Sequence, residues 1–282
     1  MNKIISAIDF SDCSINAFLH ALSIAQACKC NLILVWVAKP ETQKDQFIDA
    51  PGDASSEAKK KLEEMVEKYQ PELPEGKISY KVRVGKVYKE IAAEAKAQKA
   101  ILVVAGTHGS SGFEKFWAGS NANRLVSSCE CPVITIRGGI NIKKPLHLIV
   151  LPIDSTLETR QKATFTGYLA HQFNAEIHIL KLYTSKIKAV RNDVDLYASQ
   201  VAQYFDQEKI RYIVTGRQAE NLSDTMIDYA KEVNANLISI MTDQESSTMN
   251  IWMGPYAQQT VNHSPIPVLS IHSRELMTIQ TN

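Results

Sequence analysis

The sequence predicts an α/β protein made of two tandem domains, each with a doubly wound parallel sheet. Two observations carry this prediction: short apolar runs alternate with helical segments along the chain, and the second half repeats the first. Such alternation favours a parallel sheet with helices on both faces. Right-handed crossovers then give the doubly wound arrangement. A chain of 282 residues is long enough for two such domains.

The repeat is visible at two constant offsets. Residues 101–137 align without a gap with residues 236–272, 135 positions later. The starts of the two halves align at an offset of 145, which places Asp9 on Asp154. The two offsets differ by ten residues. We place this difference in the polar stretch 39–56, whose lack of periodicity predicts a surface loop.

Each half has its own series of predicted elements. In the first half we expect strands at 3–8, 32–37, 78–84, 100–105 and 133–136, and helices at 13–28, 56–69, 87–98 and from about Gly119. In the second half we expect strands at 146–153, 176–182, 210–215, 236–241 and 267–271, and helices at 157–173, 193–207, 219–233 and 255–263. Residues 137–144 read as a linker, so the predicted domains are 1–138 and 145–273.

Composition narrows the function class. The 31 basic and 30 acidic side chains leave a net charge of +1, which gives no electrostatic reason to expect a nucleic-acid or anionic-membrane partner. No apolar run approaches the roughly 20 residues of a membrane span. The start of the chain lacks the features of a signal peptide, so a cytoplasmic location is expected. An odd count of five cysteines is typical of reduced thiols.

Residues suited to phosphate binding fall where such a sheet binds ligands. Ligands of open α/β sheets sit beyond the carboxyl ends of the strands, near the switch in strand order. Asp9 ends the first predicted strand, Gly106 and Gly109 follow the fourth, and Gly119-Ser120 open a helix. Glycine lets backbone approach a phosphate, and a helix N-terminus favours an anion. This pattern predicts a phosphate cradle; the alternative is that the glycines only permit a turn and a helix cap.

The spacing Gly106-x2-Gly109-x9-Gly119-Ser120 resembles the nucleotide-binding signature of universal stress proteins. Residues 4–26 (IISAIDFSDCSINAFLHALSIAQ) are similar to the first strand and helix of that family. The resemblance covers essentially the whole chain as two copies. It implies an adenine nucleotide alpha hydrolase-like fold with a five-stranded sheet in each domain.

The resemblance also implies a ligand and its contacts. The ligand would be ATP, or AMP or ADP, with Mg²⁺. Asp9 would approach the ribose or a divalent ion, and Val37 would contact adenine through its backbone. Ala105 and Gly106 would border the ribose. The residues expected around the phosphates are His108, Gly109, Gly119, Ser120 and Asn121.

The second half departs from this signature. Met241 and Gln244 replace the first two glycines and Pro255 replaces the serine, while Asp154 and Gly254 remain. Larger side chains stand where backbone should approach phosphate, and proline removes one N–H from the helix start. The second site is therefore predicted to be degenerate and without nucleotide.

Two cysteine pairs could be read as metal ligands. Cys28-x-Cys30 and Cys129-x-Cys131 each fall where a helix turns into a strand. Structural zinc sites usually have the spacing C-x2–4-C, and the two pairs lead into different strands. We therefore predict thiols and no metal site.

No catalytic residue is assigned. The chain has neither a G-x4-G-K-[ST] loop nor a G-x-S-x-G elbow, and no residue plainly supplies a base to activate water. The leading hypothesis is an ATP-binding stress-response regulator or nucleotide-dependent switch. The alternatives are a weak ATPase or nucleotide-dependent enzyme, and a scaffold protein without nucleotide. The two domains are expected to pair through 133–136 and 267–271, and a homodimer remains open.

Overall fold

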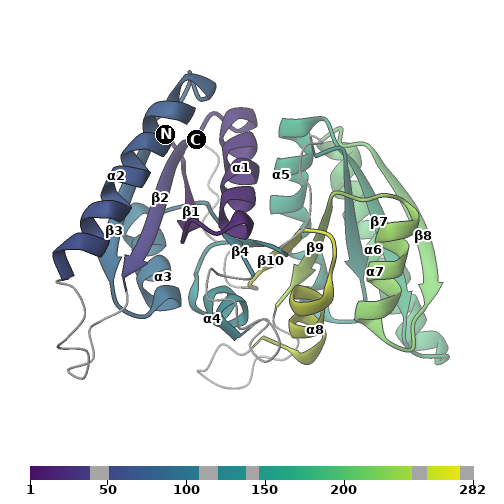
Figure 1. Ribbon diagram of the computed structural model, residues 1–282. Coiled ribbons are helices and arrows are strands. Elements are labelled where there is room, and N and C mark those ends of the chain that lie inside the picture. Colours follow the sequence, from purple (N-terminus) through teal and green to yellow (C-terminus); the bar gives the residue numbers. More distant parts are fainter. Residues whose placement is uncertain (39–50, 108–119, 138–145, 243–252, 274–282) are drawn as a thin grey trace.

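The computed structural model describes residues 1–38, 51–107, 120–137, 146–242 and 253–273. Its described strands form one ten-stranded sheet in the order β3-β2-β1-β4-β5-β10-β9-β6-β7-β8 (Figure 1). Each half of the chain contributes five strands, and every neighbouring pair within a half is parallel. The predicted α/β architecture, with two tandem doubly wound units, is confirmed.

The elements follow in the predicted alternation. The first half contains β1 (Lys3–Ile8), α1 (Asp12–Ala27), β2 (Asn31–Ala38), α2 (Pro51–Tyr69), η1 (Gln70–Glu72), β3 (Ile78–Val84), α3 (Val87–Gln98), β4 (Leu102–Gly106), α4 (Ser120–Ser128) and β5 (Val133–Ile136). The second half contains β6 (Leu148–Ile153), η2 (Leu157–Arg160), α5 (Ala163–Phe173), β7 (Glu176–Tyr183), α6 (Lys188–Gln207), β8 (Tyr212–Gln218), α7 (Leu222–Glu232), β9 (Leu237–Met241), α8 (Pro255–His263) and β10 (Val268–Ile271).

Three helix predictions need correction. The predicted loop 39–56 is wrong in its last part, because α2 already begins at Pro51; proline suits a first helical turn, where its missing N–H has no partner to lose. The predicted helix 157–173 is divided into the 3-10 turn η2 and the helix α5. Helix α6 begins at Lys188 and not at 193.

Two hydrophobic cores lie on opposite faces of the sheet. Successive residues of β1 alternate between them: Ile4 belongs to the core under α1, α2, α5 and α6, and Ile5 to the core under α3, α4, α7 and α8. Both cores contain residues from both halves of the chain. The tandem units therefore share continuous cores as well as a continuous sheet.

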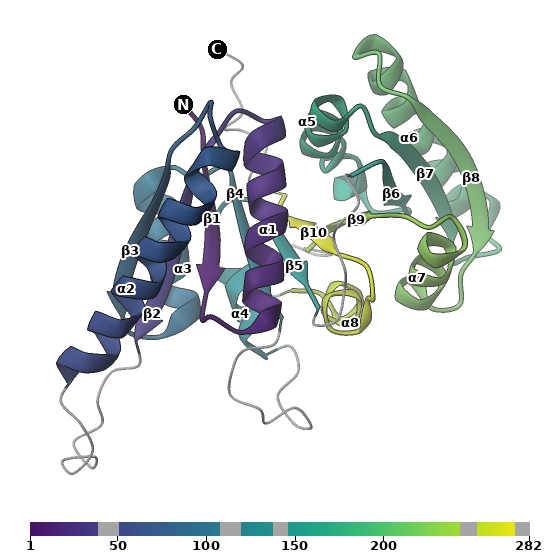
Figure 2. The same cartoon turned by 45° about the horizontal axis from the view of Figure 1, so that its top comes forward.

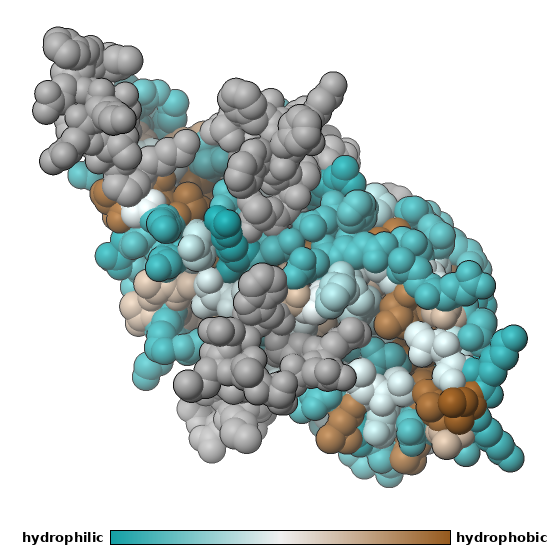
Figure 3. Space-filling view, turned by 90° about the horizontal axis from the view of Figure 1, so that it is seen from below, coloured by the Kyte–Doolittle hydropathy of each residue, from teal (hydrophilic) through white to brown (hydrophobic). Residues whose placement is uncertain are grey.

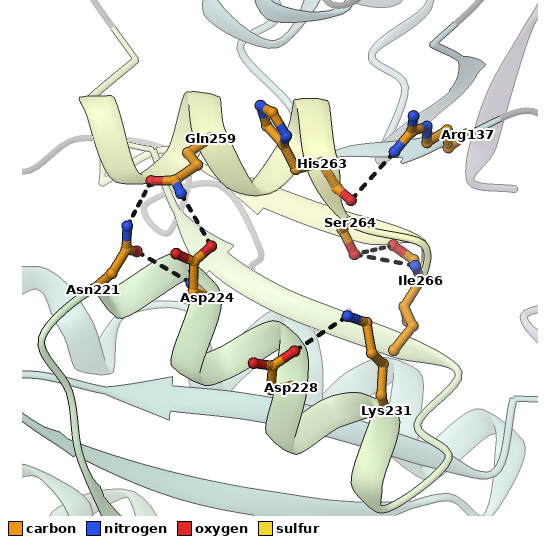
Figure 4. Close-up of polar contacts among 9 residues, drawn as sticks. All are labelled: Arg137, Asn221, Asp224, Asp228, Lys231, Gln259, His263, Ser264 and Ile266. Carbon is orange, nitrogen blue, oxygen red and sulfur yellow. Dashed lines mark hydrogen bonds and ion pairs between the residues drawn. The ribbon is translucent and has the colours of Figure 1, made fainter.

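The two halves join at their last strands. β5 and β10 pair antiparallel, with Thr135 opposite Val268, so the predicted pairing of the closing strands is confirmed. The buried His272 bridges the boundary: its ring nitrogens lie 2.6 Å from Thr242 Oγ1 and 2.7 Å from the carbonyl oxygen of Val126 on α4. From the first half, the guanidinium group of Arg137 donates to the carbonyl oxygen of His263, the last residue of α8, at 3.4 Å (Figure 4).

The predicted linker 137–144 lies outside the described residues except for Arg137. The domain boundaries 1–138 and 145–273 therefore stay predictions. Within the described part of the chain, none of the helices combines the length and the apolar character that crossing a membrane requires.

Candidate nucleotide site

The strand order of the first half reverses between β1 and β4. The ladder between these strands runs from Ile4↔Leu102 to Ser6↔Val104. Both strands continue two residues beyond it, to Ile8 and Gly106. Their carboxyl ends therefore separate at the switch point, which is where open α/β sheets hold ligands. Figure 3 looks onto this edge, whose described surface is largely hydrophilic with separate hydrophobic patches.

Asp9 stands directly after β1 and is fixed by the start of α1. Phe10 adopts a left-handed backbone conformation with φ 65°, which turns the chain sharply between strand and helix. Ser11 then donates from its N–H and its hydroxyl to Asp9 Oδ1, at 3.0 and 2.6 Å. Ser11 is also the N-cap of α1 and accepts a hydrogen bond from the N–H of Ser14. One cap residue thus both begins the helix and orients the carboxylate.

Val37 lies on a part of β2 that extends past β1. The β1–β2 ladder ends at Ile8↔Trp36, whereas β2 stays paired with β3 through Val37↔Arg83. The side of the Val37 backbone that faces the switch point is therefore beyond the last residue of β1. The contact of this backbone with adenine stays a prediction.

Gly106 has a packing role of its own. A Cβ built on Gly106 would stand 2.7 Å from Cys13 Sγ and 3.1 Å from the Cys13 carbonyl carbon. Such contacts are too close, so the first turn of α1 can approach the end of β4 only because Gly106 has no side chain. The neighbouring Ala105 is buried. Part of the glycine signal therefore comes from helix packing and does not depend on a ligand.

The remaining predicted residues belong to the loop and to α4. His108, Gly109 and Gly119 lie outside the described residues. Ser120 begins α4, and Asn121 is exposed in its first turn. Because β4 and β5 are parallel, α4 starts at the carboxyl edge of the sheet, the same edge as Asp9.

The second half repeats the carboxylate but surrounds it differently. Asp154 Oδ1 accepts from the N–H of Thr156 at 2.8 Å, and the Asp154 N–H donates to Thr159 Oγ1 at 3.2 Å. In the first half Ser11 and Ser14 make the same two contacts with Asp9. Close to Asp154 stands Lys162, which is 1% exposed and donates to the Thr159 carbonyl oxygen at 2.7 Å. Burial lowers the pKa of Lys162 to about 8, although the negative charge of Asp154 acts in the opposite direction.

Two further side chains fill the second site. Met241, at the position of Gly106, is buried. Tyr256, at the position of Asn121, lies near enough to Asp154 that burial first and that carboxylate second raise its pKa well above the ordinary range. A side chain at this position would prevent the close approach that Gly106 allows α1, and β9, which ends at Met241, contacts η2; we therefore attribute the break between η2 and α5 to Met241.

Sequence reasoning missed Lys162. It is a lysine at the N-cap of α5, at the repeat position of the fully buried Ala17. That mismatch between two aligned positions could have identified it. Among the residues that the structure describes, no three His, Cys, Asp or Glu side chains gather as a metal site.

Comparison with known proteins agrees with the tandem architecture. The model of the universal stress protein family matches residues 1–137 and again 146–272. A universal stress protein from Methanocaldococcus jannaschii is 29% identical over 147 residues, covering 48% of this chain and 81% of that protein.

Two solved structures share the fold over nearly the full length. A universal stress protein from Archaeoglobus fulgidus superposes with a TM-score of 0.75 at 17% identity, covering 96% of both chains. A Pseudomonas aeruginosa protein of unknown function gives 0.65 at 14% identity, covering 98% of this chain and 94% of its own. With the family model matched twice and this fold at full length, the chain belongs to the universal stress protein family.

Proposed function

We propose that the chain binds an adenine nucleotide at the carboxyl edge of its first half and acts as a nucleotide-dependent regulator in a stress response. The observation that carries the proposal is the contrast between the two switch points. In the first half the helix cap fixes Asp9 beside the separated ends of β1 and β4. In the second half Lys162 and Tyr256 stand near the equivalent carboxylate.

The chemistry of the first site favours a phosphorylated ligand held with Mg²⁺. A carboxylate suits a ribose hydroxyl or a hydrated Mg²⁺, and the start of α4 offers backbone N–H groups to an anion. The second site has its own ammonium group beside Asp154, so a bound cation is not needed to balance that charge. We therefore propose one nucleotide per chain. The cytoplasmic location expected from the sequence is kept as part of this proposal.

A matched pair of variants tests the site. Asp9→Asn keeps an oxygen that Ser11 can hydrogen-bond but removes the charge, so the Kd for MgATP should rise at least about tenfold, the loss of one charge-assisted contact. Asp154→Asn makes the same change in the second half and should leave the Kd unaltered. Isothermal calorimetry on both variants and the wild type measures this difference.

The resident ligand is identified separately. Protein purified without added nucleotide is denatured, and the released small molecules are separated by chromatography. About one adenine nucleotide per chain supports the proposal. Wild-type protein that releases no nucleotide and gives no heat with ATP, ADP or AMP contradicts it and leaves the scaffold alternative. Steady release of phosphate from ATP would instead favour the weak ATPase.

A further inference from the structure

Cys28 and Cys30 lie at the two ends of one tight helix cap. Cys28 is the C-cap of α1, and Lys29 follows in a left-handed conformation with φ 51°. The N–H of Lys29 donates to the Gln26 carbonyl oxygen at 3.3 Å, and that of Cys30 to the Ala25 carbonyl oxygen at 2.9 Å. This is the hydrogen-bond pattern of a Schellman cap. The turn brings the two side chains together: the Cys30 thiol donates to the Cys28 carbonyl oxygen at 3.4 Å, and the two sulfurs lie close enough for each thiol to shift the pKa of the other.

The second half builds the same cap without sulfur. Asn174 has φ 49°, and the N–H of Ala175 donates to the Ala170 carbonyl oxygen at 2.8 Å. At the positions of the two cysteines this half has Phe173 and Ala175. The cap geometry therefore does not require cysteine, and the thiol pair needs another reason.

A tyrosine from the other half completes the cluster. Helices α1 and α5 lie side by side on one face of the sheet (Figures 1 and 2), and Cys28 at the end of α1 and Tyr168 on α5 pack against the same hydrophobic core, close enough for each group to shift the pKa of the other. Cys28 is half-buried, whereas Cys30 is fully buried. Because α1 runs back from Asp9, its C-terminal cap lies at the amino edge of the sheet, opposite the candidate nucleotide site.

The surroundings give the two sulfurs different reactivity. The neighbouring Cys30 thiol lowers the pKa of Cys28, burial opposes this effect, and the Tyr168 hydroxyl adds to the lowering. The same contact, together with burial, holds the pKa of Cys30 well above its usual range. The partly exposed sulfur is thus the nucleophile, and the buried one remains protonated beside it.

We propose that Cys28 and Cys30 form a peroxide-reactive thiol pair that closes to an intramolecular disulfide at the boundary between the two halves. The Cys28 thiolate attacks a hydroperoxide, ROOH: an S–O bond forms, the O–O bond breaks, and the departing alkoxide takes a proton from solvent and leaves as ROH. Cys30 then attacks the sulfenic acid: the S–S bond forms, the S–O bond breaks, and the departing hydroxide takes the Cys30 proton as water. Two thiols lose two electrons and the peroxide gains them.

The cap can accommodate this bond. Residues two apart lie no more than about 7 Å apart even in extended chain, and disulfides span Cα separations of about 4.4–6.8 Å. The left-handed Lys29 makes this segment shorter than extended chain. Closing the disulfide removes the thiol that Tyr168 contacts, so oxidation changes a contact between the halves. This inference is independent of nucleotide binding.

Peptide mapping of the full-length protein tests the proposal. Reduced protein is treated with hydrogen peroxide near pH 7, remaining thiols are blocked with N-ethylmaleimide, and trypsin is added. Trypsin cleaves after Lys29, so only a disulfide keeps the peptides that begin at Ile4 and Cys30 joined. We expect this linked pair in the wild type and in Cys129→Ser/Cys131→Ser, and its loss in Cys28→Ser.

Two more variants follow the individual steps. Cys30→Ser should leave Cys28 as a sulfenic acid that dimedone traps. Tyr168→Phe should slow the oxidation of Cys28 about threefold, because it removes a hydroxyl group that lowers the pKa of Cys28 and so favours the thiolate. The proposal is overturned if the peptides never link, if the link survives in Cys28→Ser, or if peroxide oxidises the 129/131 pair in preference.

Discussion

Acidification from pH 7 to pH 4.5 should lower the free energy of unfolding by about 2.5 kcal/mol through His20 alone. His20 lies on α1, is 5% exposed, and its Nε2 has no hydrogen-bond partner among the described residues. Burial lowers its pKa from 6.5 to about 4. Between these values the unfolded chain binds a proton that the folded chain does not. Stability due to neutral His20 is therefore complete above pH 6.5 and is lost as the pH falls toward 4.

The repeat supplies the matching variants. Phe165 occupies the position of His20 in the second half and is buried there. His20→Phe should remove this part of the acid sensitivity, and the reciprocal Phe165→His should add a similar dependence. Urea unfolding at pH 7 and pH 4.5 measures both. If the wild type and His20→Phe lose the same stability on acidification, His20 does not carry the effect.

The sequence was sufficient for the fold because the fold depends on local patterns. Apolar runs of four to eight residues marked the strands, and the two closing runs were expected to pair, although their antiparallel direction was seen only in the structure. Helix starts were predicted less well. The charged pattern of α2 is clear only from residue 56, yet the helix begins five residues earlier at Pro51. We attribute the break before α5 to Met241, which is distant in sequence.

The candidate site was only partly predictable for a similar reason. Asp9 and Gly106 could be placed at the carboxyl edge from strand order alone. That Gly106 also makes room for Cys13, and that Lys162 lies near Asp154, are contacts between separate elements. Hydrophobic periodicity does not reveal such contacts. A position-by-position comparison of the two halves reveals some of them, because a lysine aligned with a buried alanine indicates a local change in chemistry.

Because of Lys162, the folded state should become more stable as the pH rises from 7 to 10. Its ammonium is buried and donates to Thr159, and its pKa is lowered from 10.5 to about 8. Between these values the unfolded chain holds the proton and the folded chain releases it, so the folded state gains stability as the pH rises. From pH 7 to pH 10 this contribution amounts to about 2.5 kcal/mol.

The comparison variant is Lys162→Met, which keeps an unbranched side chain of similar length without a charge. The raised pKa of Tyr256 lowers the stability of the folded state over the same pH range. The contribution of Lys162 is therefore isolated only by the difference between the wild type and Lys162→Met. We expect wild type relative to Lys162→Met to gain about 2.5 kcal/mol between pH 7 and pH 10 in urea unfolding. A difference that does not vary with pH would mean that the ammonium is solvated. In that case Lys162 does not stand in for a bound cation beside Asp154, and the argument for an empty second site would rest on Met241 and Tyr256 alone.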